Sequence, residues 1–227
     1  MNAKNKGGIL NEKITSIFLV VFCLCFSIAL AAAQGERSAE QWYDQGNQYF
    51  DSGEYTQAVD AYTKSIEVDP HAEAYSNRGI AYRQLNQLDR AIEDYTKAIE
   101  LTPQYAEAYN NRGFSYRQLN QLDRAIQDYT KAIESNPQYA RAYYNRGNTY
   151  VKLDQLERAI QDYTKAIVIN PQYAMAYFNR GNTYTVLNQK EKAIESYQLF
   201  LNYADHTTMD KEIEAVKKRI LVLNGGK

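Results

Sequence analysis

The chain has 227 residues, with 26 basic and 27 acidic side chains and two cysteines. This balance predicts no strong electrostatic field for nucleic acid or for an acidic substrate. Both cysteines, Cys23 and Cys25, lie in the N-terminal apolar run, so the chain after residue 33 cannot form a disulfide, a cysteine nucleophile or a cysteine-based zinc site.

The first 33 residues have the pattern of a secretory signal peptide. Residues 1–13 carry three lysines, residues 14–33 are uncharged and mostly apolar, and the run ends in three alanines. This order predicts cleavage after Ala33 and a mature chain that begins at Gln34. The alternative is an uncleaved membrane anchor, because about 20 apolar residues can span a bilayer. Both alternatives place the rest of the chain outside the cytoplasm, where it would be periplasmic, secreted or anchored by residues 14–33.

A period of 34 residues organises the rest of the sequence. Residues 106–139 return almost unchanged as residues 140–173, and one glycine in each copy marks the period: Gly79, Gly113, Gly147 and Gly181. A fixed period of this length is typical of a solenoid, in which each unit packs against its neighbours.

Each unit has the pattern of a helical hairpin. In residues 106–139, apolar and small residues recur at helical spacing in two blocks. Asn120 stands between the blocks and tolerates a left-handed helix end, and Pro137 closes the unit. Small residues such as Gly113 let the two helices approach closely, and tyrosines such as Tyr129 fill the adjacent space.

This pattern resembles the tetratricopeptide repeat (TPR), which has an aromatic residue, a glycine four positions later, a tyrosine three further on, and then small, aromatic and small residues before a proline. The resemblance implies an all-α fold, a right-handed TPR superhelix (α-solenoid) of five helical hairpins plus a C-terminal capping helix. After a linker at residues 34–38, the five units occupy residues 39–207, divided as 39–71, 72–105, 106–139, 140–173 and 174–207.

Both ends of the array carry end signals. Ser38 and Gln41 predict a capping box that opens the first helix. In residues 208–227, one apolar stripe recurs at helical spacing: Met209, Ile213, Val216, Ile220 and Leu223. A stripe docked on the fifth unit would cap the array, whereas an open stripe would recruit a second copy of the chain.

No cluster of side chains predicts catalysis. The two histidines, His71 and His206, end the first and fifth units, far apart in any linear stack. The sequence has no glycine-rich phosphate loop, and its acidic residues recur once per repeat, as on a solvated face. We therefore expect a protein that is not an enzyme and that uses no metal or cofactor.

An arginine and an aspartate recur together in the middle units, as Arg112 and Asp128 do in the third. The first unit lacks both partners, which indicates a structural ion pair with a small net effect on stability. The pair can form within one unit or across to the next. Arg180 in the fifth unit, which has Ser196 in place of the aspartate, also fits the second register.

The TPR resemblance implies that the first helix of each unit lines a concave face that holds extended peptides. An asparagine recurs on this face in the second to fifth units, flanked by aromatic residues. The amide of an asparagine can pair with a peptide N–H and C=O together. The predicted peptide-binding residues are Asn77, Asn111, Asn145, Asn179, Phe114, Tyr144 and Phe178. The alternative is that these asparagines bond only neighbouring helices.

The basic residues of TPR domains that clamp a chaperone's C-terminal carboxylate are absent here, because Tyr43, Glu73 and Glu107 hold those positions. The sequence therefore predicts a non-enzymatic scaffold that binds an extended protein segment, with no nucleic-acid partner and an unidentified protein partner. The alternative function is a self-associating structural protein of the cell envelope.

Overall fold

The computed structural model describes residues 37–226, and every regular element in this range is an α-helix. The predicted signal peptide at residues 1–33 lies outside the described residues. The helices are α2 (Ala39–Asp51), α3 (Tyr55–Val68), α4 (Ala72–Gln84), α5 (Leu88–Leu101), α6 (Ala106–Gln118), α7 (Leu122–Ser135), α8 (Ala140–Lys152), α9 (Leu156–Ile169), α10 (Ala174–Val186), α11 (Lys190–Tyr203) and α12 (Asp210–Leu223).

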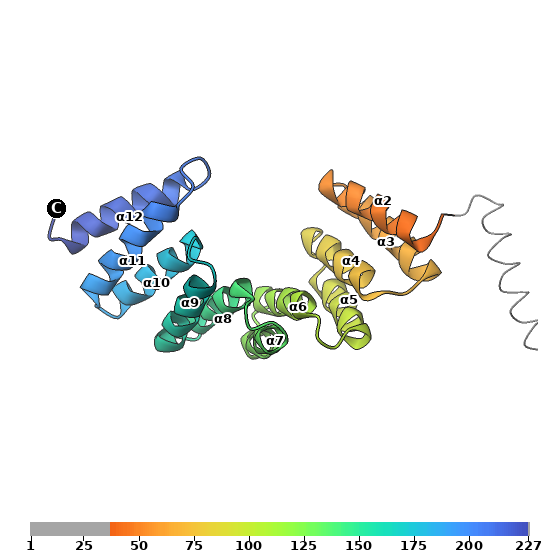
Figure 1. Ribbon diagram of the computed structural model, residues 1–227, viewed down its shortest axis with the longest axis horizontal. Helices are drawn as coiled ribbons and strands as arrows, with labels where there is room; N and C mark the ends of the chain where they lie inside the picture. The colour runs from red at the N-terminus through yellow and green to blue at the C-terminus, as the bar shows by residue number, and fades with distance from the viewer. Residues whose placement is uncertain (1–36, 227) are drawn as a thin grey trace, which may run out of the picture.

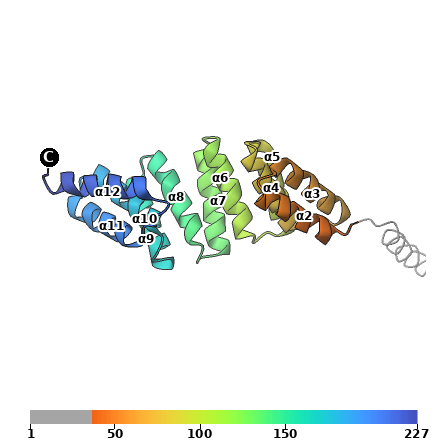
Figure 2. The same ribbon diagram turned by 90° about the horizontal axis from the view of Figure 1, so that it is seen from above.

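The helices pair in chain order into five hairpins, and the second helix of each hairpin packs on the first helix of the next. The array is bowed, with α2 near one end and α12 near the other (Figure 1). In its middle, α6 lies on the inner side of the bend and α7 on the outer side (Figure 1). Seen from above, the hairpins follow one another along the long axis (Figure 2). The predicted all-α solenoid is therefore confirmed.

The contact between the two helices of a hairpin depends on the repeat glycine. Each of these glycines faces a fully buried tyrosine of the second helix. A Cβ atom on Gly113 would lie 3.0 Å from the ring of Tyr129, and one on Gly46 would lie 2.5 Å from the ring of Tyr62. The expectation that small residues allow a close approach filled by tyrosine is correct.

The turn inside each hairpin uses a left-handed residue. Asn120 has φ of 58°, and Gly53 holds the corresponding place in the first unit with φ of 77°. The amide of the next residue, Gln121, then donates to the Tyr116 carbonyl at 2.8 Å, which closes the end of α6. An asparagine is suited to this position because its short polar side chain tolerates positive φ.

The two ends of the array are closed differently. The Ser38 hydroxyl accepts from the Gln41 amide, and the Gln41 side chain accepts in return from the Ser38 amide, so the capping box is present. At the other end, Ile213 and Val216 of α12 are buried in one cluster with Phe200 of α11. The apolar stripe of α12 is therefore docked on the fifth hairpin.

Candidate functional site: the concave face

Two hollows lie between first helices of neighbouring hairpins. The first has a volume of about 380 Å³ and is lined by residues of α2, α3 and α4: Asn47, Phe50, Asp51, Tyr62, Asn77 and Ile80. The second, of about 180 Å³, lies mainly between α8 and α10: Asn148, Val151, Leu156, Tyr163, Asn179, Asn182, Thr183 and Val186. Five of these positions correspond in the repeat, so the two hollows are variants of one site on one face.

A polar cluster, which we call the first outer cluster, joins the opening two hairpins. The Tyr62 hydroxyl donates to the side-chain oxygen of Asn47 at 2.8 Å. The Asn77 amide nitrogen donates to the Tyr43 hydroxyl at 2.9 Å and to the same Asn47 oxygen at 3.2 Å. Both protons of the Asn77 amide are thus used, whereas no described residue donates to its oxygen.

The second outer cluster repeats this geometry at the junction of the fourth and fifth hairpins. The Tyr163 hydroxyl donates to Asn148 Oδ1 at 2.8 Å. Asn179 donates to that oxygen at 2.7 Å and to the Tyr144 hydroxyl at 3.1 Å. The two half-buried asparagines, Asn77 and Asn179, therefore each keep an acceptor oxygen for a ligand N–H.

The two middle asparagines of the predicted ladder are less accessible. Asn111 is 8% exposed and Asn145 is 5% exposed. Asn145 donates to the side-chain oxygen of Asn110 at 2.9 Å, and Asn110 donates to Asn111 at 3.5 Å. In the free chain all four asparagines hold neighbouring side chains in place, and their contact with a peptide remains a prediction.

Of the three predicted aromatic residues, two lie in the C-terminal half of the face. The Tyr144 ring lies 4.9 Å from that of Tyr173. Phe178 packs 5.3 Å from Phe200, and the guanidinium of Arg219 lies 5.5 Å from its centre. Arg219 also donates to Asn182, so α12 reaches the concave face and closes its C-terminal end.

The third aromatic residue, Phe114, lies in the middle of the face between two arginines. The guanidinium carbon of Arg83 lies 5.0 Å from the ring centre, and that of Arg117 lies 4.8 Å from it. Among residues 37–226, neither arginine forms a salt bridge. We call these three residues the central patch.

Two buried tyrosine hydroxyls in the second and third hairpins have no hydrogen-bond partner within the described part of the chain. They belong to Tyr95 and Tyr129, whose counterparts in the outer clusters donate to an asparagine. That asparagine follows the repeat glycine, and here Ile80 and Phe114 replace it. Burial raises the pKa of Tyr129 to about 12, although the Arg117 guanidinium opposes the rise. In the sequence, the residue after each repeat glycine indicates whether the buried tyrosine hydroxyl has an asparagine as its partner.

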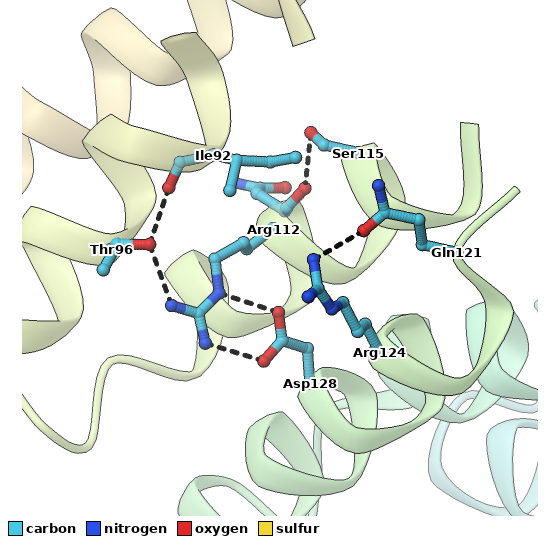
Figure 3. Close-up of polar contacts among 8 residues, drawn as sticks. Ile92, Thr96, Arg112, Ser115, Gln121, Arg124 and Asp128 are labelled. Atoms are coloured by element: carbon cyan, nitrogen blue, oxygen red, sulfur yellow. Dashed lines mark hydrogen bonds and ion pairs between the residues drawn. The ribbon is translucent and has the colours of Figure 1, made fainter. Parts of the chain in front are cut away.

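The recurring arginine and aspartate pair within one unit. Arg112 donates to both carboxylate oxygens of Asp128 at 2.8 Å, and its third nitrogen donates to Thr96 of the preceding unit at 3.0 Å (Figure 3). Burial raises the pKa of Asp128, and the contact with Arg112 opposes that rise. Arg180 makes the same two contacts, to Ser196 of its own unit and to Thr164 of the preceding unit. Of the two registers that the sequence left open, the arginine therefore pairs with the aspartate of its own unit.

Among residues 37–226, no group of three or more histidine, cysteine, aspartate or glutamate side chains could hold a metal ion. None of the helices in this range has both the length and the apolar character needed to cross a membrane.

Family models of the tetratricopeptide repeat match most of the array. A TPR repeat model matches residues 46–84, 79–119 and 113–154, and two further tetratricopeptide repeat models match residues 140–173 and 162–195. The chain belongs to the tetratricopeptide repeat family. No curated protein sequence matches this TPR chain.

Solved TPR structures resemble the array closely. A crystal structure of MamA is 29% identical, with a TM-score of 0.64, and the match covers 70% of this chain and 93% of MamA. The first TPR domain of Spaghetti (RPAP3), bound to the HSP90 peptide SRMEEVD, is 31% identical with a TM-score of 0.50, over 52% of this chain and 94% of that domain. PilF of Pseudomonas aeruginosa shares the fold at 17% identity, with a TM-score of 0.69 over 83% of this chain and 93% of PilF. Proteins of this family are generally scaffolds without catalytic activity.

Proposed function

We propose that this TPR protein is a non-enzymatic scaffold outside the cytoplasm that binds an extended peptide segment of a partner protein along its concave face. The observation that carries the proposal is the pair of matching hollows, each beside an outer cluster. Both clusters hold an asparagine whose amide oxygen is unoccupied, at Asn77 and Asn179. A ligand that meets equivalent sites along a solenoid must itself be extended.

The acceptor oxygens favour recognition of the peptide backbone. Each hydrogen bond from a backbone N–H would contribute about 1 kcal/mol net, so several bonds in register are needed for useful affinity. The Spaghetti domain, which resembles this chain over 52% of its length, is a TPR domain with a bound peptide. The bound peptide of this domain, which is 31% identical to the chain, supports a peptide as the class of ligand.

Self-association as the main function has less support. It required the apolar stripe of α12 to be open, and Ile213 and Val216 are instead buried against the fifth hairpin. The scaffold proposal needs no such opening, because its ligand contacts lie on the first helices.

A displayed library of random dodecapeptides tests the proposal, with the exported chain immobilised as bait. Wild type should enrich a set of peptides, and Asn77→Ala combined with Asn179→Ala should weaken their binding about thirtyfold, because two acceptors worth about 1 kcal/mol each are lost. The control carries Lys165→Ala and Val168→Ala, which alter the exposed side of α9. If no peptide is enriched, or if both variants lose binding equally, the concave face does not bind peptides in this way.

A further inference from the structure

The central patch lies on the same face as the two hollows. Arg83 and Arg117 occupy the positions in their units that Phe50 holds in the first hollow and Val151 in the second. A peptide that runs from one hollow to the other must therefore cross the patch.

The patch concentrates positive charge that no salt bridge within residues 37–226 neutralises. Both guanidinium carbons lie within 5.0 Å of the centre of the Phe114 ring, so they are no more than about 10 Å apart and repel each other. The acidic residues on the same helices, Glu73 and Glu107, stand ten positions before the arginines. Ten helical residues span about 15 Å, which is too far for an ion pair.

Donor groups at the patch lack acceptors. Within the described part of the chain, Arg117 Nε is buried and has no hydrogen-bond partner. The hydroxyls of Tyr95 and Tyr129 also have none there, and both tyrosines are 0% exposed. Burial raises the pKa of both tyrosines, and the Arg83 guanidinium opposes the rise at Tyr95 as the Arg117 guanidinium does at Tyr129. The ring of Phe114 holds the guanidinium groups by cation–π contact and leaves their N–H edges for an anion.

We propose that the central patch is a subsite for an acidic side chain of the bound peptide, whose carboxylate is held between Arg83 and Arg117 beside Phe114. A carboxylate accepts two hydrogen bonds from one guanidinium fork, and it would relieve the repulsion between the two arginines. Because hollows lie on both sides of the patch, the peptide chain continues in both directions, and the carboxylate belongs to an internal aspartate or glutamate. This inference rests on the proposed function and names the chemistry of the partner.

The dodecapeptide library tests it with three baits: wild type, Arg83→Gln combined with Arg117→Gln, and Arg90→Gln combined with Arg124→Gln. The last is a matched control, because Arg90 and Arg124 lie in the same two units and are exposed on the second helices. Wild type and the control should enrich peptides with an aspartate or glutamate in their interior. The patch variant should bind the same peptides about tenfold more weakly, since it lacks both guanidinium forks.

Synthetic versions of the enriched peptides separate the possible sources of the carboxylate. Binding should persist when the C-terminus is amidated and should fall when the internal glutamate is replaced by glutamine. Enriched peptides without an acidic preference, or binding that depends on the free C-terminus, would overturn the inference and leave the scaffold proposal standing. Failure to enrich any peptide would reject both. Unchanged binding to the patch variant, with its helical circular dichroism intact, would also overturn the subsite.

Discussion

The hydroxyl of Tyr163 donates a 2.8 Å hydrogen bond to Asn148, whereas the equivalent hydroxyl of Tyr129 has no partner among residues 37–226. The two tyrosines stand 34 positions apart in the repeat and are equally buried, at 1% and 0% exposure. The difference comes from one residue on the facing helix, Asn148 in one unit and Phe114 in the other. The position after the glycine therefore sets whether the buried tyrosine hydroxyl of a unit has a hydrogen-bond partner on the facing helix.

This contrast predicts opposite effects of the same substitution. Tyr163→Phe should lower the free energy of unfolding by about 1 kcal/mol, because it removes a buried hydrogen bond to Asn148. Tyr129→Phe should be neutral or slightly stabilising, because it removes a buried hydroxyl that has no partner. Urea denaturation of the two variants, followed by circular dichroism, measures the difference. Equal loss of stability would show that the Tyr129 hydroxyl has a partner in solution.

The repeat glycines predict a graded cost of overpacking. Gly46→Ala should destabilise the array by about 1–3 kcal/mol, because its methyl group would lie 2.5 Å from the buried ring of Tyr62. Gly113→Ala should cost less, because the corresponding distance to Tyr129 is 3.0 Å. Both variants gain the same helix propensity, so the difference between their thermal midpoints reports the clash. The reverse order would show that the backbone, and not the ring, limits the approach.

The Arg112–Asp128 pair predicts that replacing the aspartate alone costs more folding stability than replacing both residues. Asp128→Ala should cost about 3–5 kcal/mol, because it leaves the largely buried guanidinium of Arg112 without its counter-ion. Arg112→Gln combined with Asp128→Ala reproduces the first unit, which has Gln45 and Ala61, and should cost less. A double-mutant cycle by urea denaturation gives both values. A double variant less stable than Asp128→Ala would mean that Arg112 stabilises chiefly through its bond to Thr96.

Because α12 is docked on the fifth hairpin, a charge on its buried face should affect stability and association far more than a charge on its exposed face. Val216→Asp should destabilise the fifth hairpin and expose apolar surface that promotes association, because Val216 is 0% exposed. Leu221→Asp places the same charge on the same helix at a residue that is 54% exposed, and should leave stability unchanged. Light scattering and thermal denaturation of both variants test this. A monomeric Val216→Asp chain with wild-type stability would exclude a capping role for α12.

The N-terminal pattern predicts export of the chain and removal of its first 33 residues. N-terminal sequencing should begin at Gln34, because a basic start, an apolar run and three alanines precede it. Replacing Ala31 and Ala33 by leucine should block cleavage and retain the chain in the membrane fraction. An intact Met1 in the wild-type chain would instead identify residues 14–33 as an anchor.

Much of this molecule was determined by local sequence. The glycine period, the apolar spacing and the left-handed Asn120 specify the hairpins without reference to distant residues, because helix geometry and turn conformation are local. The same 34-residue period also identified the tyrosines that fill the space beside each glycine, since every unit repeats the same contact.

Only the tertiary structure decided what the concave face presents. The sequence left two registers for Arg112 and Asp128, and the packing of α6 on α7 brings the two side chains together within one unit. The period placed Asn111 and Asn145 on the first helices, but their burial depends on how closely neighbouring helices approach. Arg83 and Arg117 stand 34 positions apart, and they meet at Phe114 because the stacking of two hairpins brings equivalent residues side by side. Contacts between units are set by the packing of whole helices, which no single unit of the sequence contains.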